Sequence, residues 1–262
     1  MKLTIKCKSK TLTADSVSEI PRLLAKAART GAEKTKKAAL DIRDIASELY
    51  SSREDIKYDI EQIKERDPAA VSSFEVALMY SGFHAVMAHR VSHALAARGY
   101  TLSARALSQG AKFFTGIEIH PGATIGKGFF IDHGTGVVIG ETTVIGDNCT
   151  VYQGVTLGGT GKDVGKRHPT LGNNVMVGAG AKVLGPFTVG DNSKIAAGAV
   201  VLKEVPECST AVGIPAKVIG RSVKAPVQDL DQVHIPDPVA RELAELRAKI
   251  SNLEKLLEDK KL

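Results

Sequence analysis

The sequence contains no tryptophan, and phenylalanine and tyrosine together make up only 5% of its 262 residues. A core of packed aromatic rings is therefore excluded. The chain instead contains 25 glycines, and 43% of its residues are hydrophobic. This balance favours a core of small and β-branched side chains under a tightly turning backbone, which is typical of a repeat fold.

The chain also lacks a run of about eighteen apolar residues, the minimum for a membrane span. Its three cysteines, Cys7, Cys149 and Cys208, are odd in number and far apart. They fit neither a disulfide framework nor a metal-binding knuckle. We therefore expect a cytoplasmic protein without a membrane partner and without a bound metal.

Positive charge is unevenly distributed. The net charge is +6, but residues 1–40 hold ten lysines and arginines against three acids, so the rest of the chain is close to neutral. With so few aromatic side chains, there is no stacking platform for single-stranded nucleic acid, and we expect no nucleic-acid partner. The basic segment of residues 1–40 contains acids and few arginines, which favours a solvated or helical arm over a transit peptide, and we place a basic N-terminal arm at residues 1–15.

Residues 16–116 show the periodicity of helices. Apolar residues recur at spacings of three and four in "AALDIRDIASELY" and "DIKYDIEQI", and again in "VSSFEVALMYSGFHAVMAHRVSHALAARG", until Gly99 provides a stop. Asp67-Pro68 should interrupt the helices, because a residue before proline is pushed out of the α region. We therefore predict several packed helices here.

From residue 117 the period becomes six. The aliphatic positions fall in three successive phases: Ile119, Ile125, Ile131 and Val137; Ile139, Ile145, Val151 and Leu157; Leu171, Val177, Val183, Val189, Ile195 and Val201. This hexapeptide repeat predicts a parallel β-helix over residues 117–220, with each of these side chains in the core. Cys149 falls where the repeat places small core residues, so we interpret it as structural.

The two phase breaks are the candidate functional places, because extra residues in a repeat go to surface loops. The first break adds two residues around "DHGTGV", and the second adds eight around "GGTGKDVGKRHPT". His133 in the first break is a candidate general base, since a histidine pKa of about 6.5 suits proton transfer near neutrality. Glu118 is a candidate carboxylate to orient it. By spacing alone, a surface histidine at a corner of the coil remains equally open.

Three other chemistries fit poorly. The second break is not a phosphate-binding loop, because Thr160 stands where the first glycine belongs and Arg167 where Ser or Thr should bind magnesium. "HRVSH" at 89–93 has metal-ligand spacing but lacks the glutamate of a zinc protease, so packed or surface histidines are favoured. A γ-type carbonic anhydrase needs three histidine ligands, and the coil offers only His120, which we interpret as structural, His133 and His168.

Together these motifs resemble the serine acetyltransferases, a family of hexapeptide-repeat acyltransferases. The resemblance runs from about residue 55 to 220 and rests on these segments: "RDPAA" (66–70), "GFHA" (82–85), "IEIHPGATIGKGFFIDHGTGVVIGE" (117–141), "TLGGTGK" (156–162), "KRHPTLG" (166–172), "GAGAKVLG" (178–185) and "GIPAKVIG" (213–220).

The resemblance implies an α+β protein, with an N-terminal helical oligomerisation domain at 16–116 and a left-handed parallel β-helix catalytic domain at 117–220. It further implies a homotrimer, or a dimer of trimers joined through the helices. Acetyl-CoA would be a co-substrate rather than a permanently bound cofactor, and L-serine the acceptor. A sugar or antibiotic hydroxyl as acceptor, or a non-catalytic β-helical binding protein, remains the alternative.

The resemblance also assigns residues. His133 corresponds to the family's general base and Glu118 to the carboxylate that orients it, although many relatives have aspartate at this position. The implied ligands of serine are Asp67 and Asp132, with Arg167 and His168 gripping its carboxylate. The residues implied to line the CoA groove are Gly158, Gly159 and Ala179.

The C-terminal segment, which follows a linker at 221–235, is not covered by the resemblance. In residues 236–262, apolar side chains alternate at spacings of four and three, the pattern of a short coiled coil. One amphipathic helix packed on its own subunit is the alternative. Many relatives end in a tail that closes with isoleucine and binds O-acetylserine sulfhydrylase. This chain ends in Leu262 after a charged run, so we predict a self-associating helix and weak or absent binding to that enzyme.

Overall fold

The computed structural model describes residues 3–7, 10–14, 20–161, 164–221 and 238–259. Contacts divide the chain into a unit that ends at Ser52 and a larger unit that begins at Arg53. None of the helices in these ranges is long and apolar enough to cross a membrane.

The N-terminal unit contains two antiparallel strands, β1 (Leu3–Cys7) and β2 (Lys10–Ala14), and the helix α1 (Ile20–Ser51). The helical alternative for the basic arm is therefore wrong for these residues. The reason lies in the sequence, because "LTIKC" and "KTLTA" alternate apolar and polar residues with the period of a strand.

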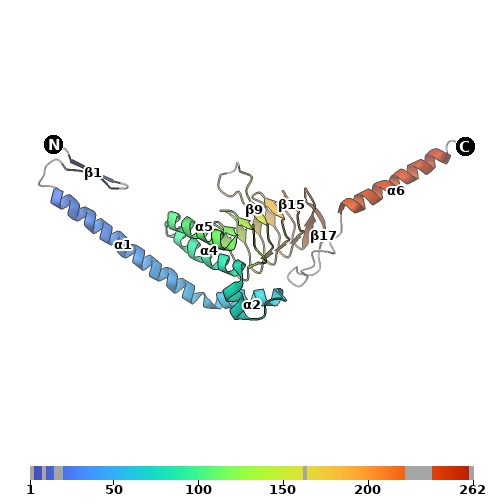
Figure 1. Cartoon of the computed structure of the whole chain (residues 1–262). Coiled ribbons are helices and arrows are strands. Elements are labelled where there is room, and N and C mark those ends of the chain that lie inside the picture. The colour runs from blue at the N-terminus through green and yellow to red at the C-terminus, as the bar shows by residue number, and fades with distance from the viewer. Residues whose placement is uncertain (1–2, 8–9, 15–19, 162–163, 222–237, 260–262) are drawn as a thin grey trace. The chain divides into compact units, whose positions relative to one another are not determined.

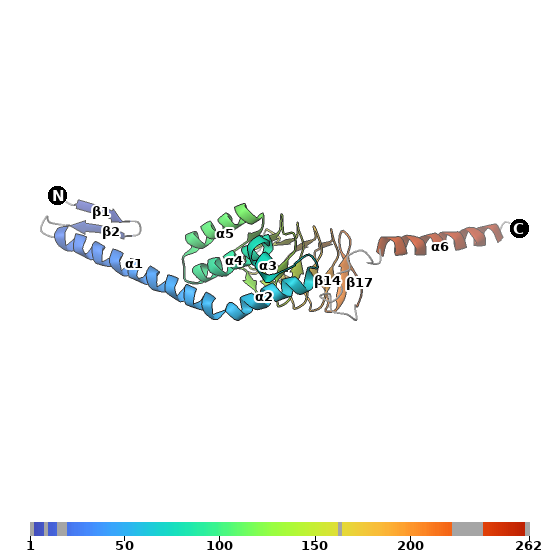
Figure 2. The ribbon, with the colours of Figure 1, turned by 60° about the horizontal axis from the view of Figure 1, so that its bottom comes forward.

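The larger unit begins with four helices: α2 (Arg53–Arg66), α3 (Ser73–Met79), α4 (Ser81–Ala97) and α5 (Thr101–Thr115). As predicted, α2 ends just before Asp67-Pro68. Gly99 follows α4 in the left-handed region, at φ 84°, which only glycine adopts without strain. Helices α4 and α5 pack against each other and against β3 at the first turn of the coil (Figures 1 and 2).

The coil begins at Glu118, and its short strands stack into three sheets (Figure 1). Sheet 1 contains β3 (Glu118–Ile119), β6 (Val138–Ile139), β9 (Thr156–Gly158), β12 (Lys182–Leu184) and β15 (Val200–Val201). Sheet 2 contains β4 (Thr124–Ile125), β7 (Val144–Ile145), β10 (Thr170–Leu171) and β13 (Thr188–Val189). Sheet 3 contains β5 (Phe130–Ile131), β8 (Thr150–Val151), β11 (Met176–Val177), β14 (Lys194–Ile195), β16 (Ser209–Val212) and β17 (Lys217–Arg221).

All strand pairs in the three sheets are parallel except β16 with β17, where the chain turns back on itself. The predicted aliphatic residues line the interior. All are buried except Ile125, which is partly buried against the same core. Cys149 is fully buried and its thiol donates to the carbonyl oxygen of Gly172 at 3.0 Å. Burial raises the pKa of this thiol to about 12, so its structural interpretation is confirmed.

Both phase breaks lie at corners of the coil. We call the corner stack between sheets 3 and 1 the histidine edge; it comprises residues 132–137, 152–155, 178–181 and 196–199. The stack between sheets 1 and 2 is the loop edge; it comprises residues 120–123, 140–143, 158–161, 164–169 and 184–187. The register of sheet 1 continues through the first insertion, because Glu118 pairs with Val138 and Val138 with Thr156. Sheet 1 is therefore continuous past the insertion, and the extra residues lie in the corner next to it.

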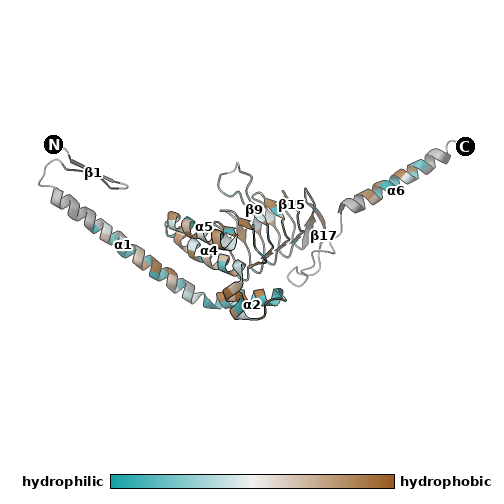
Figure 3. Ribbon diagram, in the orientation of Figure 1, coloured by the Kyte–Doolittle hydropathy of each residue, from teal (hydrophilic) through white to brown (hydrophobic). Residues whose placement is uncertain are grey.

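A last helix, α6 (Pro238–Asp259), is present as predicted. Its described apolar residues are all about half exposed: Leu243, Leu246, Ile250 and Leu253. Figure 3 shows apolar and polar residues interleaved along this helix. The expected linker at 221–235 lies almost entirely outside the described residues.

Candidate active site

His133 projects from the histidine edge, and its side chain is 74% exposed. The insertion explains this placement. His133, Gly134 and Gly136 all adopt left-handed backbone angles at this corner, whereas the next three corners of the edge each use a glycine, namely Gly154, Gly180 and Gly198. A histidine at φ 57° is unusual, and such backbone strain often accompanies functional sites.

One carboxylate lies beside this histidine, and a second lies near the first. Asp132 Oδ1 lies 3.8 Å from His133 Nε2. Burial raises the pKa of Asp132, and the negative charge of Asp67 raises it further, while His133 partly offsets both effects. Asp67 and Asp132 therefore form an electronegative pair that favours a bound cation.

Asp67 is held firmly although it lies in a loop. Its Oδ1 accepts a hydrogen bond from the Ala69 N–H at 2.8 Å, and its Oδ2 accepts one from the Tyr80 hydroxyl at 2.7 Å. Sequence reasoning missed Tyr80. Nothing in its spacing marks it, because it lies between α3 and α4 and reads as part of one continuous helical pattern.

The end of α2 that precedes Asp67 is anchored on the coil by Arg66. This buried guanidinium donates to the carbonyl oxygen of Gly128 at 3.1 Å and to Thr150 Oγ1 at 3.1 Å. About two helical turns before Arg66, Asp59 of α2 forms an ion pair with Arg90 and accepts a hydrogen bond from the Gly128 N–H. These contacts hold α2 against the coil and so bring Asp67, the residue that follows α2, to the histidine edge.

Arg167 and His168 lie together at the loop edge, organised by Thr142. The Thr142 Oγ1 accepts from the backbone N–H groups of Arg167 and His168, at 3.0 and 3.1 Å. The Arg167 guanidinium forms an ion pair with Glu141. The partly exposed Arg167 guanidinium has further N–H donors, so this ion pair leaves capacity for a second carboxylate.

His168 is only 8% exposed, and its Nδ1 accepts from the Thr142 N–H at 3.2 Å. Burial lowers its pKa, and the charge of Arg167 lowers it further. The neutral ring then carries its proton on Nε2. Gly140 makes room for this ring, since a Cβ there would lie 1.9 Å from His168 Cδ2.

Glu118 is not joined to His133 by a hydrogen bond in the described part of the chain. Its carboxylate instead accepts from Lys112 Nζ at 2.6 Å and from Gln109 Nε2 at 3.5 Å. The bond from Lys112 lowers the pKa of Glu118, so the carboxylate is ionised. It stands on sheet 1, next to the histidine edge, and its role in orienting His133 stays a prediction.

The residues expected to line a CoA groove are divided between the histidine edge and the loop edge. Ala179 lies on the histidine edge, two coils beyond His133, whereas Gly158 and Gly159 lie at the start of the loop edge. Sheet 1 separates the two edges within one chain. One chain therefore carries two separate groups of candidate residues, one with His133, Asp132 and Asp67 and one with Arg167 and His168.

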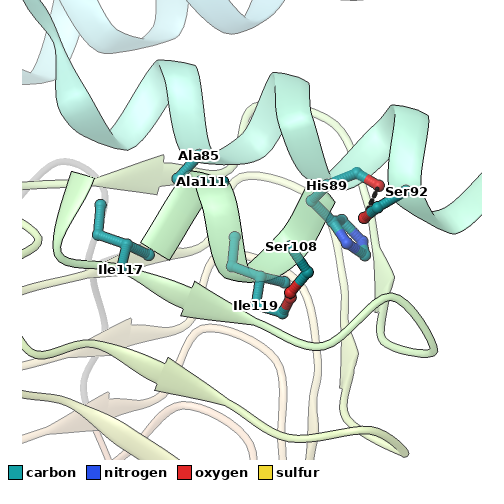
Figure 4. A pocket seen from close by; sticks show the side chains of 7 residues that line it. All are labelled: Ala85, His89, Ser92, Ser108, Ala111, Ile117 and Ile119. Carbon is teal, nitrogen blue, oxygen red and sulfur yellow. Dashed lines mark hydrogen bonds between the residues drawn. The ribbon is translucent and has the colours of Figure 1, made fainter. Parts of the chain in front are cut away.

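Three other histidines, His89, His93 and His120, are buried or partly buried in the structure. His120 Nδ1 accepts from the Gly122 N–H at 3.0 Å, and His93 Nδ1 lies 2.8 Å from the carbonyl oxygen of Pro121. His89 is 4% exposed. It borders a small pocket between α4, α5 and the first coil (Figure 4), lined by Ala85, His89, Ser92, Ser108, Ala111, Ile117 and Ile119. The interpretation of "HRVSH" as packed histidines is confirmed.

The burial of His89 predicts acid sensitivity. Burial lowers its pKa to about 3, so the folded protein cannot take up the proton that the unfolded chain binds below about pH 6.5. The free energy of unfolding should therefore fall as the pH drops, and between pH 7 and 5 this residue should contribute about 2 kcal/mol of the loss. Urea unfolding of the wild type and His89→Leu at both pH values measures it. Identical pH dependence in the two proteins would contradict the assignment.

Comparison with known proteins agrees with this geometry. The family model described as "Serine acetyltransferase, N-terminal" matches residues 2–88, and two hexapeptide-transferase models match residues 136–159 and 168–203. The chain is 57% identical to a serine acetyltransferase of Bacillus subtilis over 206 residues, which cover 79% of this chain and 95% of that one.

Solved structures give the same result. A serine acetyltransferase of Brucella abortus in complex with coenzyme A is 42% identical, with a TM-score of 0.67 over 70% of this chain and 73% of that one. One of Neisseria gonorrhoeae in complex with serine is also 42% identical, with a TM-score of 0.65 over 68% of this chain and 72% of that one. These matches confirm the predicted left-handed β-helix preceded by helices.

Proposed function

Because this chain belongs to the serine acetyltransferases of the hexapeptide-repeat superfamily, we propose that it transfers the acetyl group of acetyl-CoA to the hydroxyl of L-serine. The products are O-acetyl-L-serine and CoA, in the first step of cysteine biosynthesis. The observation that carries this proposal is the presence of two complementary groups on the coil. One edge carries two neighbouring carboxylates and an exposed histidine, and the other edge carries an arginine and a neutral histidine.

These groups complement an amino-acid zwitterion. The carboxylates of Asp67 and Asp132 suit an ammonium group, and the Arg167 guanidinium with the His168 Nε2–H suits a carboxylate. A sugar would need neither charge. The charges therefore favour serine over the sugar-type acceptor, and the relative solved with serine supports the same choice.

In the reaction, His133 acts as the general base. It removes the proton from the serine hydroxyl as the oxygen attacks the thioester carbonyl, and the imidazolium then protonates the departing CoA sulfur. General-base catalysis of this kind contributes about 10²–10⁴-fold. Glu118 stabilises the imidazolium once its carboxylate turns from Lys112, and Gly158, Gly159 and Ala179 line the groove for CoA, which binds as a substrate.

The division of the site between two edges favours a homotrimer in which the histidine edge of one chain faces the loop edge of the next. Closed rings of identical chains build such shared sites without further parts. The helices offer surface for a second trimer, because several of their apolar side chains are more than half exposed: Phe74, Leu78 and Met79 of α3, and Leu102, Phe113 and Phe114 of α5. We place the reaction in the cytoplasm, where the free Cys149 and Cys208 stay reduced.

Release of free thiol from acetyl-CoA tests the activity. We expect thiol release with L-serine and little with serinamide, N-acetylserine or simple sugars, because each of these lacks at least one of the two charges that the edges recognise. Faster release with a sugar than with serine would favour the sugar-type acceptor. No release with any hydroxyl compound would leave the non-catalytic binding protein as the better interpretation.

We further propose that α6 pairs with the same helix of neighbouring subunits. Leu243, Leu246, Ile250 and Leu253 form a half-exposed seam at heptad spacing. Lys249 and Glu254 flank this seam at positions that face each other between adjacent parallel helices, so their opposite charges favour self-pairing. A trimeric body holds the helices at high effective concentration, which offsets the shortness of the seam.

Deletion of residues 236–262 should therefore lower the thermal stability or loosen the oligomer, while acetyl transfer is retained. Light scattering at low protein concentration and thiol release measure the two properties. As a control, Ser251→Cys and Leu253→Cys can be compared under oxidation, since only position 253 lies in the seam and should cross-link. Tight binding of full-length protein to O-acetylserine sulfhydrylase, lost on deletion with the oligomer unchanged, would show a docking tail instead.

A further inference from the structure

Tyr80 has no role in the assignments made so far, yet its hydroxyl contacts Asp67 of the acid pair formed by Asp67 and Asp132. It follows α3 directly and precedes α4, and its backbone is extended, at φ −84° and ψ 107°. Its backbone N–H donates to the Val76 carbonyl oxygen at the end of α3. The turn fixes the ring, and its hydroxyl reaches back across thirteen residues to Asp67 Oδ2 at 2.7 Å.

The two carboxylates of the pair are held differently. Both oxygens of Asp67 accept from neutral donors, Ala69 N–H and Tyr80 O–H. Among the described residues, Asp132 is contacted by the His133 backbone N–H and, at a longer distance, by the His133 ring. Two donors fix the orientation of the Asp67 carboxylate, so Asp67 is the more firmly oriented member of the pair.

We propose that Tyr80 is a positioning residue for the acceptor substrate: its hydroxyl holds the Asp67 carboxylate in the orientation that faces the ammonium group binding between Asp67 and Asp132. This inference rests on the proposed serine acetyltransferase activity. Tyr80 acts through Asp67 and touches no reacting atom, so it should affect serine binding more than the acetyl transfer itself.

The surroundings of Tyr80 keep it a donor. The acidic groups that face it are Asp67 from the loop, Glu75 from α3 and Asp132 from the coil. Glu75 is itself engaged, because its Oε2 accepts from the Val71 N–H at 3.0 Å. Burial raises the pKa of the Tyr80 phenol, and the hydrogen bond to Asp67 raises it further. The phenol therefore remains protonated at any pH at which the enzyme would work.

The test is Tyr80→Phe in the full chain, assayed by thiol release over a range of pH. A hydrogen bond to a charged group justifies an increase of about ten- to a hundredfold in KM for serine. We expect kcat at saturating serine and KM for acetyl-CoA to be unchanged. The increase in KM should persist across this pH range, because the raised pKa of the Tyr80 phenol keeps it a hydrogen-bond donor throughout.

Tyr58→Phe is the matched control. Its hydroxyl donates to Asn148 Oδ1 at 2.8 Å, a bond of the same kind in the same unit that is not made to the acid pair. Asn148 Oδ1 also accepts from Arg66 Nη2 at 3.3 Å, so it keeps a partner when the Tyr58 hydroxyl is removed, and the serine kinetics should be unchanged. In an Asp67→Asn background, Tyr80→Phe should add no further loss in serine affinity, because the partner of the hydroxyl has lost its charge.

Each outcome decides the proposal. An unchanged KM for serine across this pH range in Tyr80→Phe would overturn it. Equal losses for serine and acetyl-CoA, or an equal loss in the Asp67→Asn background, would also overturn it, because they indicate general damage to the fold. A wild-type protein without serine-dependent thiol release would instead refute the proposed function.

Discussion

Replacement of His133 by alanine should lower kcat for acetyl transfer by about 10²–10⁴-fold, because the serine hydroxyl loses the base that removes its proton. His133 is mostly solvent exposed at a corner of the coil, so its loss should spare the fold. Steady-state thiol release measures the effect, and light scattering with thermal unfolding shows whether the oligomer and the stability are preserved.

Gln153→Ala is the matched control for this variant. Gln153 follows Val151 by two residues, as His133 follows Ile131, and it is exposed on the same edge one coil further on. We expect this substitution to leave kcat within the range of the wild type. If His133→Ala released thiol at a near-normal rate, His133 would be a surface residue and the mechanism would need another base.

Arg167→Ala should raise KM for serine by about ten- to a hundredfold, as expected for the loss of a charge-assisted hydrogen bond to a carboxylate. The change in kcat should be smaller, because Arg167 binds the acceptor and does not move a proton. Initial rates at varied serine and fixed acetyl-CoA measure both constants.

Two comparisons make this result specific. Arg167→Lys keeps the charge and loses the planar fork, so it should recover only part of the affinity. Serinamide should be a poor acceptor for the wild type and should lose little more in Arg167→Ala, since its amide offers no carboxylate to the guanidinium. A wild type that uses serinamide as well as serine would remove Arg167 from the acceptor site.

The coil was largely predictable because its signal is periodic. Each hexapeptide of the coil needs one aliphatic side chain that points into the core. A change in the phase of these aliphatic residues therefore marks an insertion wherever it occurs. His133 and the Arg167–His168 pair followed from these breaks, and the structure places them at corners of the coil as the breaks require. The assignment of roles came from the family resemblance.

The rest could not be predicted, because it depends on contacts between segments with different periods. The hydroxyl of Tyr80 meets Asp67 only because a loop and two helices fold back together. Glu118 looked like a partner for His133 by separation along the chain, yet the nearby ammonium of Lys112 at the end of α5 holds its carboxylate. The strands β1 and β2 were missed because the count of basic residues obscured their alternation.

The unbroken register of sheet 1 limits where a reacting group can stand along the coil axis. Neighbouring strands lie about 4.8 Å apart, and the corner that carries His133 sits between two coils whose pairing continues past it. A corner insertion transplanted to the next coil would thus displace its imidazole by one whole step and keep its direction. Distances along the axis change only in whole coils, so adjustment finer than one step must come from side-chain length, such as aspartate or glutamate at position 118.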